Sequence, residues 1–294
     1  MKATPSIYRY IAFHTNQNHQ RVRFCLHASR MASTFDSTQP PRSKIEDVFK
    51  GLRHNEKQTF LLDGGTGEEL FRRGVPDDRK IWSATAVVHP QYHDILADVH
   101  NSFLQSGSNA ITTNSYGVVP GVGFDENQIS EYVAQSGKIA RSAARNYNIH
   151  STSPAFVFGS LGPLVESYRP DKIMSHDEGV KCYKLACRSL APYADAFIAE
   201  TMSCVEESIQ VLDAVASSPD IESAPGRQHH YLLISYSVDS DGNFRDGEKI
   251  TNGIRRILDE AQKKSGQVQS KISLKQFEEK IVNYTGTSYA FLNF

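Results

Sequence analysis

Short apolar runs alternate with longer amphipathic stretches along the chain from about residue 60 onwards. The runs are rich in β-branched and aromatic residues, which predicts buried β-strands. The predicted strands cover residues 60–62, 109–113, 155–158, 196–199, 231–236 and 289–292. Polar and glycine residues come directly after several of these runs, at the carboxyl end of each strand.

The stretches between the runs have the spacing of amphipathic helices, with apolar residues returning every three or four positions. Three such apolar faces comprise Tyr92, Leu96, Val99 and Phe103; Val205, Ile209, Leu212 and Ala216; and Ile250, Ile254, Ile257 and Leu258. Repeated strand and helix units whose strands are buried on both faces predict an α/β fold with a parallel sheet wrapped by helices. When such a parallel sheet closes into a barrel, the active site lies at the carboxyl ends of the strands.

Composition narrows the class of protein. The chain has 294 residues, 39% of them hydrophobic, and a formal net charge of -1, so it can bury a sizeable core and has no excess charge that favours nucleic acid. No apolar run approaches the roughly 18 residues of a membrane span. The four cysteines show no C-x-x-C spacing, and reduced thiols are expected. We therefore expect a cytoplasmic protein without nucleic-acid or membrane partners.

The first 42 residues differ from the rest. Before Asp36 they contain arginines, lysine, histidines, serines and threonines but no acidic residue. An arginine-rich, acid-poor segment is typical either of a disordered tail or of a transit segment that directs organellar import. Residues 39–42 (QPPR) have the composition of a linker. The predicted organisation is therefore a basic tail and linker over 1–42, followed by one domain over 43–294.

The segment 61–74 (LLDGGTGEELFRRG) carries the clearest candidate chemistry. A short strand runs into a glycine turn that opens a helix, an arrangement in which backbone N–H groups converge on an anion. Thr66 and Glu69 fit a capping box, and Asp63 lies beside the turn, where it could hold an ammonium group. An ordinary βα turn is the alternative. A dinucleotide site is weaker because Leu70 replaces the third glycine of G-x-G-x-x-G, and a phosphate site lacks a Lys or Arg in the turn.

Several motifs in order along the chain resemble the homocysteine S-methyltransferase family. They are 63–67 (DGGTG), 107–116 (GSNAITTNSY), 159–163 (GSLGP), 200–202 (ETM), 235–237 (SYS) and 246–247 (DG). The resemblance covers residues 59–294 and implies a parallel (β/α)8 TIM-type barrel. It also implies transfer of a methyl group from a sulfonium or ammonium donor to the thiol of homocysteine, which gives methionine.

The resemblance assigns a homocysteine pocket to matching residues. Backbone amides of Gly64, Gly65 and Thr66 would hold the carboxylate, while Asp63 and Glu200 would hold the ammonium. A carboxylate such as Glu200 at the end of an apolar strand is costly unless a cation meets it, although a salt bridge to Lys or Arg would also serve. The donor side is expected to include Thr113, Asn114 and Tyr116, which could instead finish the second strand with hydrogen bonds.

The family also implies a zinc ion held by three cysteines, which activates the thiol, and these cysteines have no counterparts here. Either Asn293 is the asparagine of the family's Asn-Cys motif, with Phe294 in the place of the cysteine, or the chain ends just before that motif. Cys182 and Cys187 are five residues apart on a predicted helix and cannot bind one metal from the same face. Cys204 is the nearest thiol to Glu200, but one thiolate does not make a zinc site. No metal ligand or catalytic residue is therefore assigned.

Only six of eight barrel strands are predicted, which suggests a barrel truncated after its sixth strand. The expected explanation is a shortened gene model or splice product of an enzyme; the alternative is a short isoform that binds homocysteine or another amino acid, or regulates, without catalysis. Open edges at the first and sixth strands would favour an oligomer or an aggregate.

Overall fold

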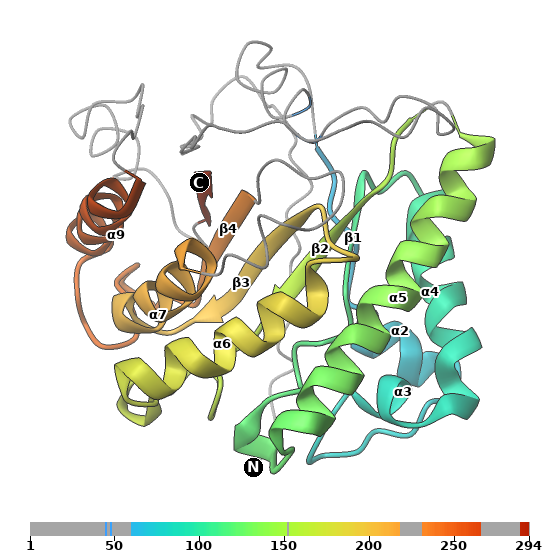
Figure 1. Ribbon diagram of the computed structural model, residues 1–294, viewed down its shortest axis with the longest axis horizontal. Coiled ribbons are helices and arrows are strands. Elements are labelled where there is room, and N and C mark those ends of the chain that lie inside the picture. Colours follow the sequence, from blue (N-terminus) through green and yellow to red (C-terminus); the bar gives the residue numbers. More distant parts are fainter. Residues whose placement is uncertain are drawn as a thin grey trace.

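The computed structural model describes residues 45, 48, 60–151, 153–217, 231–265 and 289–293 (Figure 1). The α-helices are α2 (Thr66–Arg72), α3 (Thr85–Val88), α4 (His93–Gln105), α5 (Glu126–His150), α6 (His176–Leu190), α7 (Val205–Ala216) and α9 (Ile250–Ser265). Short 3-10 helices cover Pro90–Tyr92, Pro120–Val122 and Pro170–Lys172. The strands are β1 (Ala110–Thr112), β2 (Phe156–Leu161), β3 (Ala196–Met202), β4 (Tyr231–Tyr236) and β5 (Tyr289–Asn293).

The strands form one sheet in the order β1-β2-β3-β4-β5, and the first four are parallel. Helices α5, α6 and α7 lie side by side across one face of this sheet, with α4 next to α5 and α9 next to α7 (Figure 1). Helices α5, α6 and α7 therefore each return the chain from one parallel strand to the start of the next, and α9 follows β4. This confirms the predicted α/β fold with a parallel sheet.

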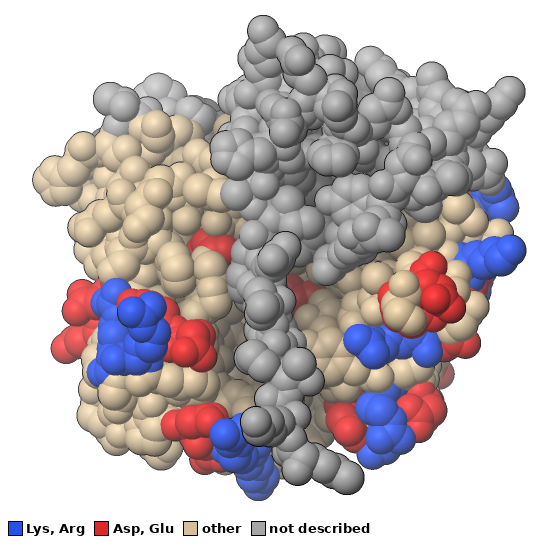
Figure 2. Space-filling model, turned by 180° about the vertical axis from the view of Figure 1, so that it is seen from behind, with Lys and Arg blue, Asp and Glu red and all other residues tan. Residues whose placement is uncertain are grey.

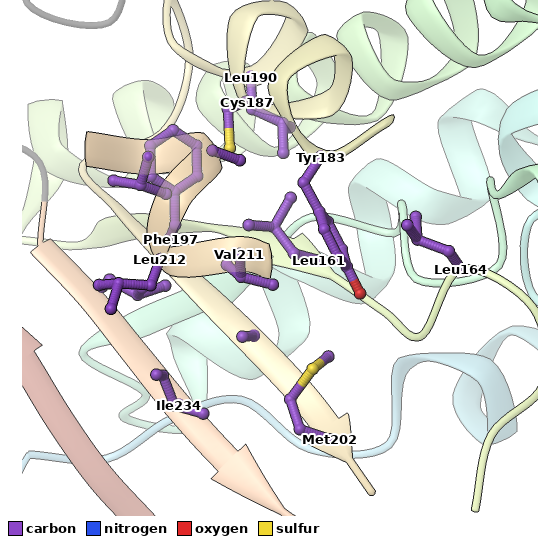
Figure 3. Packing of buried hydrophobic residues seen from close by; sticks show 14 of the residues in the cluster. Leu161, Leu164, Tyr183, Cys187, Leu190, Phe197, Met202, Val211, Leu212 and Ile234 are labelled. Atoms are coloured by element: carbon purple, nitrogen blue, oxygen red, sulfur yellow. The ribbon is translucent and has the colours of Figure 1, made fainter. Parts of the chain in front are cut away.

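Successive side chains of a strand point to opposite faces of the sheet, and those on both faces are apolar. On β3, Phe197 and Ala199 pack toward the helices, where they meet Leu190 and Cys187 of α6 (Figure 3). Their neighbours on the opposite face belong to a second cluster with residues from the other strands and the N-terminal segment. That cluster comprises Ile45, Phe60, Ala110, Phe156, Phe158, Ala196, Ile198, Tyr231 and Leu233. A sheet covered on both sides leaves the carboxyl ends of its strands as the accessible edge for chemistry.

Two sequence predictions need correction. Residues 60–62 do not form a full strand: Leu62 makes one isolated parallel bridge to Ala110, and Leu61 is held by the side chain of Asn109 at 2.8 Å. The last predicted strand forms as β5, but it runs antiparallel to β4, not parallel as the repeated units implied. The backbone groups along the edge of β4 can pair with a strand of either direction, so a local apolar pattern predicts the strand without its direction.

Charged side chains of both signs are visible on one face of the molecule (Figure 2). On the face shown in Figure 2, lysines and arginines lie beside aspartates and glutamates in mixed groups. Among the described residues, no helix is both long and apolar enough to cross a membrane. The tail, transit segment and linker predicted over 1–42 lie outside the described residues, as does Phe294.

Candidate functional site

The carboxyl ends of the parallel strands bring two acidic residues to one place. Asp63 follows the Leu62 bridge beside β1, and Glu200 lies near the end of β3. The negative charge of Glu200 contributes to the raised pKa of Asp63, which places the two carboxyl groups within electrostatic range of each other. The two predicted ammonium-binding residues therefore share one site.

Asp63 is almost completely buried, with 2% of its surface exposed. Its carboxylate accepts a hydrogen bond from the backbone N–H of Thr112 at 2.7 Å and another from the Thr112 hydroxyl at 2.8 Å. Burial raises the pKa of Asp63 to about 7, against the opposing effect of these two hydrogen bonds. A carboxyl group balanced in this way is poised to ionise when a cation arrives.

Glu200 is held by the strand beside it. The hydroxyl of Ser160, on β2, donates a hydrogen bond of 2.6 Å to the Glu200 carboxylate. Burial raises the pKa of Glu200 as well, while the Ser160 hydrogen bond opposes the shift. Among the described residues, no Lys or Arg forms a salt bridge with Glu200 or Asp63, so the salt-bridge alternative for Glu200 has no support there.

A β-bulge lies next to Glu200. Between Ala199 and Met202 the register of β3 shifts against β4, so that three steps along β3 oppose two along β4. Thr201 lies in this bulge with φ of +62°, a left-handed conformation that is rare for a β-branched residue. A bulge re-aims the neighbouring side chains and is common beside active sites. The strained backbone at Thr201 thus bends the end of β3 directly after Glu200, the residue that carries the carboxylate.

We expect Thr201→Gly to raise the free energy of unfolding by about 1 kcal/mol. Glycine removes a left-handed strain of about 1 to 3 kcal/mol, less about 0.5 to 1 kcal/mol for its greater freedom in the unfolded chain. Thr201→Ala is the matched control, because alanine keeps most of the strain. Urea unfolding measures both variants, and a Thr201→Gly variant less stable than Thr201→Ala would contradict the assignment of strain.

The glycine turn has the close packing that its sequence suggested. A Cβ on Gly64 would lie 2.7 Å from the ring of Phe103, so that position admits no larger residue without movement. Gly65 is the N-cap of α2 and Thr66 its first residue. Within the described part of the chain, no hydrogen bond uses the backbone N–H groups of Gly64, Gly65 or Thr66. These N–H groups remain available to an anion.

The predicted capping box is wrong. Thr66 lies inside the helix instead of at its N-cap, and no side chain caps α2. Glu69 instead forms an ion pair of 2.9 Å with Arg73 one turn later. The helix begins one residue earlier than the capping box requires, with Gly65 as its N-cap, and this moves Thr66 out of the capping position.

The polar residues after β1 divide into two groups. Thr113 is buried, and its hydroxyl accepts the backbone N–H of Ser160 at 2.9 Å and contacts the hydroxyl of Ser115 at 2.8 Å. Asn114 donates to the backbone carbonyl of Ser83 at 2.7 Å. These contacts connect the ends of β1 and β2 and the loop before α3, and they match the alternative of strand-ending hydrogen bonds.

Tyr116 is half-buried, whereas Thr113 and Asn114 are buried. Its hydroxyl lies 2.7 Å from that of Ser167, and its ring centroid lies 6.4 Å from that of Trp82. Trp82 is 41% exposed and is the single tryptophan of the chain. Sequence reasoning did not identify Trp82, because no motif marks it and its partner is distant along the chain. In this pair Trp82 is exposed and Tyr116 is half-buried, and the faces of such rings attract cations.

Backbone strain is concentrated around this end of the sheet. The described non-glycine residues with positive φ are Trp82, Tyr168 and Thr201, and each lies in a segment at or near the carboxyl ends of the strands. Strained conformations of this kind collect at functional sites. Thr112, Ser160 and Thr201 also belong to the site. Each lies within one of the family motifs, 107–116, 159–163 and 200–202, although none was assigned a role from the sequence.

The described cysteines do not form a thiolate cluster. Cys187 is completely buried among core residues of α6, and burial raises the pKa of its thiol far above the usual value (Figure 3). Cys182 lies on the same helix and is partly buried. Cys204 is the N-cap of α7, 2% exposed, and burial raises its pKa to about 12. Cys187 is therefore a core residue.

One group of three metal-ligand side chains occurs in the described part of the chain. Ligand atoms of Cys204, Glu206 and Asp246 all lie within 4.8 Å of one another. However, Glu206 forms an ion pair with Arg256, and Asp246 accepts the backbone N–H of Glu248 at 2.9 Å. A buried thiol that resists deprotonation and two engaged carboxylates do not match a zinc site of three thiolates.

Comparison with known proteins decides the family. The family model described as homocysteine S-methyltransferase matches residues 60–268. This chain belongs to the homocysteine S-methyltransferase family. The match covers the glycine turn, Glu200 and the parallel strands, so the family assignment made from the sequence motifs is confirmed.

Curated members of the family match shorter segments. Homocysteine S-methyltransferase of Escherichia coli (strain K12) is 29% identical over 115 residues, which is 37% of this chain and 36% of that protein. Homocysteine S-methyltransferase 2 of Saccharomyces cerevisiae is 29% identical over 73 residues, which is 22% of each. The matched segments therefore span about a third and about a fifth of these relatives.

Solved structures extend the similarity of fold. The metallated homocysteine methyltransferase MmuM of Escherichia coli superimposes with a TM-score of 0.61 and 22% identity, over 73% of this chain and 75% of MmuM. Its oxidised form gives a TM-score of 0.58 and 23% identity, over 68% and 69% of the two chains. At these identities the similarity shows a common fold.

Proposed function

We propose that this member of the homocysteine S-methyltransferase family binds homocysteine. It transfers a methyl group from a sulfonium or ammonium donor to the thiol of homocysteine. The observation that carries the proposal is the convergence of Asp63 and Glu200 beside the backbone N–H groups of residues 64–66. The two carboxylates suit the ammonium of an amino acid, and the N–H groups suit its carboxylate. Gly64 allows the turn that carries these N–H groups to pack closely against Phe103 of α4.

The donor side follows from the aromatic pair. A sulfonium or quaternary ammonium group is attracted to the face of Trp82 or Tyr116, while Asn114 and Thr113 keep the adjoining loop in place. In the proposed reaction the thiol of homocysteine loses its proton to water, and its sulfur bonds to the methyl carbon as the bond between that carbon and the onium atom breaks. The donor leaves as a neutral sulfide or tertiary amine. The residues named here position the two substrates.

The parallel sheet is proposed to be part of a (β/α)8 barrel wall. The support is that β1 to β4 are neighbours in chain order and that their helices cover one face in the same order, as in barrels and unlike doubly wound sheets.

A second candidate is a protein that binds homocysteine or another amino acid without methyl transfer. The observation that favours it is the mismatch between the Cys204 group and a zinc-thiolate site. The two candidates differ in one product. Incubation with homocysteine, S-methylmethionine and zinc, followed by mass spectrometry, yields methionine only if the chain catalyses the transfer.

Removal of either carboxylate tests the amino-acid pocket. We expect Asp63→Asn and Glu200→Gln each to weaken homocysteine binding by about 1.5 to 3 kcal/mol, the value of a hydrogen bond to a charged group. Glu68→Gln removes an exposed charge on the neighbouring helix α2 and serves as the matched control. Calorimetric titration that finds equal affinities for the wild type and both pocket variants would refute the assignment.

Homocysteine binding should also depend on pH. The pKa of Asp63 is about 7 without ligand, and an ammonium partner requires the ionised form, so binding below pH 7 must release a proton. We expect the affinity to rise by up to about tenfold per pH unit as the pH increases toward 7 and then to level off. Calorimetry in buffers of different ionisation enthalpy counts the proton. Asp63→Asn should remove most of this dependence, and a flat profile in the wild type would contradict the role of Asp63.

A further inference from the structure

Arg245 lies at the same end of the sheet as the proposed donor site and is held there by three contacts. Its backbone N–H donates to the carbonyl of Ser203 at 3.1 Å, just after β3. Its Nε donates to the hydroxyl of Ser237 at 2.8 Å, directly after β4. Its guanidinium carbon lies 5.0 Å from the centroid of the Tyr168 ring, in the loop after β2. A long, exposed side chain is thus fixed by three segments at the carboxyl ends of the strands.

The guanidinium group nevertheless has unused binding capacity. Among the described residues, Arg245 makes no ion pair, and its two terminal nitrogens have no hydrogen-bond acceptor. A guanidinium that is stacked on an aromatic ring keeps its two terminal nitrogens free to hold a carboxylate bidentately. Tyr168, which supports the stack, has φ of +66°, so its position is maintained against backbone strain.

Arg245 is connected to the aromatic pair by a continuous set of contacts. Tyr168 follows Ser167, whose hydroxyl lies 2.7 Å from that of Tyr116, and Tyr116 is the ring beside Trp82. One edge of the site therefore carries, in order, two rings suited to an onium cation, a second tyrosine and a fixed cation. A ligand that spans this edge would need positive charge at one end and negative charge at the other.

We propose that Arg245, supported by Tyr168, binds the carboxylate of a zwitterionic methyl donor whose onium group contacts Trp82 and Tyr116. This inference rests on the proposed function and narrows its donor class. Onium compounds that carry a carboxylate, such as sulfonium amino acids and betaines, fit both ends of the edge. Onium compounds without a carboxylate fit only the aromatic end, and a folate donor lacks the fixed onium charge for that end.

The fluorescence of Trp82 provides a direct binding assay, because it is the single tryptophan of the chain. The probes are S-methylmethionine, which has a sulfonium and a carboxylate, and trimethylsulfonium, which has only the cation. In the wild type, S-methylmethionine is expected to bind more tightly than trimethylsulfonium. Arg245→Gln should raise the Kd of S-methylmethionine by on the order of tenfold or more and leave that of trimethylsulfonium within about twofold.

Two further variants separate the carboxylate contact from general damage. Tyr168→Leu removes the ring that supports the guanidinium and should weaken S-methylmethionine binding selectively, in the same direction as Arg245→Gln. Arg188→Gln removes an exposed arginine near the C-terminal end of α6 and should change neither Kd. Circular dichroism and thermal unfolding establish that each variant retains the fold of the wild type.

The outcomes distinguish this inference from the proposed function. If Arg245→Gln weakens both probes equally, weakens neither, or weakens homocysteine binding instead, the carboxylate contact is refuted while the donor site stands. If neither probe changes Trp82 fluorescence in the wild type up to millimolar concentration, the proposed donor site is refuted, and the proposed role of Arg245 is refuted as well.

Discussion

Replacing Arg141 by methionine is expected to lower the free energy of unfolding by about 3 to 5 kcal/mol. Arg141 of α5 is 5% exposed and forms an ion pair of 2.6 Å with Asp195, whose side chain is 15% exposed. Its Nε also donates to the backbone carbonyl of Tyr193 at 2.7 Å. The substitution leaves a buried carboxylate and a buried carbonyl without their cation, and this desolvation cost dominates the effect.

The partner residue provides the control. Asp195 also accepts the backbone N–H of Val157, at the start of β2, at 2.8 Å. In the double variant Arg141→Met with Asp195→Asn, the uncompensated charge is removed and the amide oxygen can still accept that N–H. We expect the double variant to recover at least half of the stability lost in the single variant, as measured by urea unfolding at pH 7. A double variant less stable than Arg141→Met would show that the ion pair is not the cause.

Phe244→Ala is expected to destabilise the chain by a similar amount, about 3 to 5 kcal/mol. The Phe244 ring is completely buried and contacts Tyr236 edge to face, with ring centroids 4.5 Å apart. It also lies so close to Gly253 of α9 that a Cβ there would approach it to 2.1 Å. Truncation therefore opens a cavity between the loop after β4 and helix α9.

Phe244 also precedes Arg245 in the chain, so this prediction has a second measurable consequence. The loop that presents the guanidinium loses its anchor in Phe244→Ala, and S-methylmethionine binding should weaken. Phe244→Leu keeps most of the volume and is expected to cost less than about 1.5 kcal/mol and to retain binding. Thermal unfolding and Trp82 fluorescence measure the two effects, and equal stabilities of the alanine and leucine variants would contradict the packing role.

Local sequence patterns predicted those elements whose information is local. The apolar spacing of Val205, Ile209 and Leu212 corresponds to α7, and the run from Ala196 corresponds to β3, because burial of one helix face or both strand faces imposes a period on neighbouring residues. The position of Glu200 after such a run was likewise readable, since a charge is exceptional there. The expected open edges and oligomerisation stay predictions.

Interactions between distant segments required the tertiary structure. The partner of Asp63 is Thr112, 49 residues away, and the ring beside Tyr116 belongs to Trp82, which no motif marks. The left-handed Thr201 and the antiparallel direction of β5 depend on register with β4, which is set by hydrogen bonds between strands.

The sequence by itself thus determined the α/β class, the family and the residue types that are proposed to form the pocket, because these depend on residue identity and short-range spacing. Only the tertiary structure decided how the pocket is held. It showed that Thr112 and Ser160 donate hydrogen bonds to the two carboxylates, that Thr113 connects the strand ends, and that Arg245 stacks on Tyr168. Hydrogen bonds and ring contacts form between atoms that are close in space, and closeness in space between distant residues follows from packing of the whole chain.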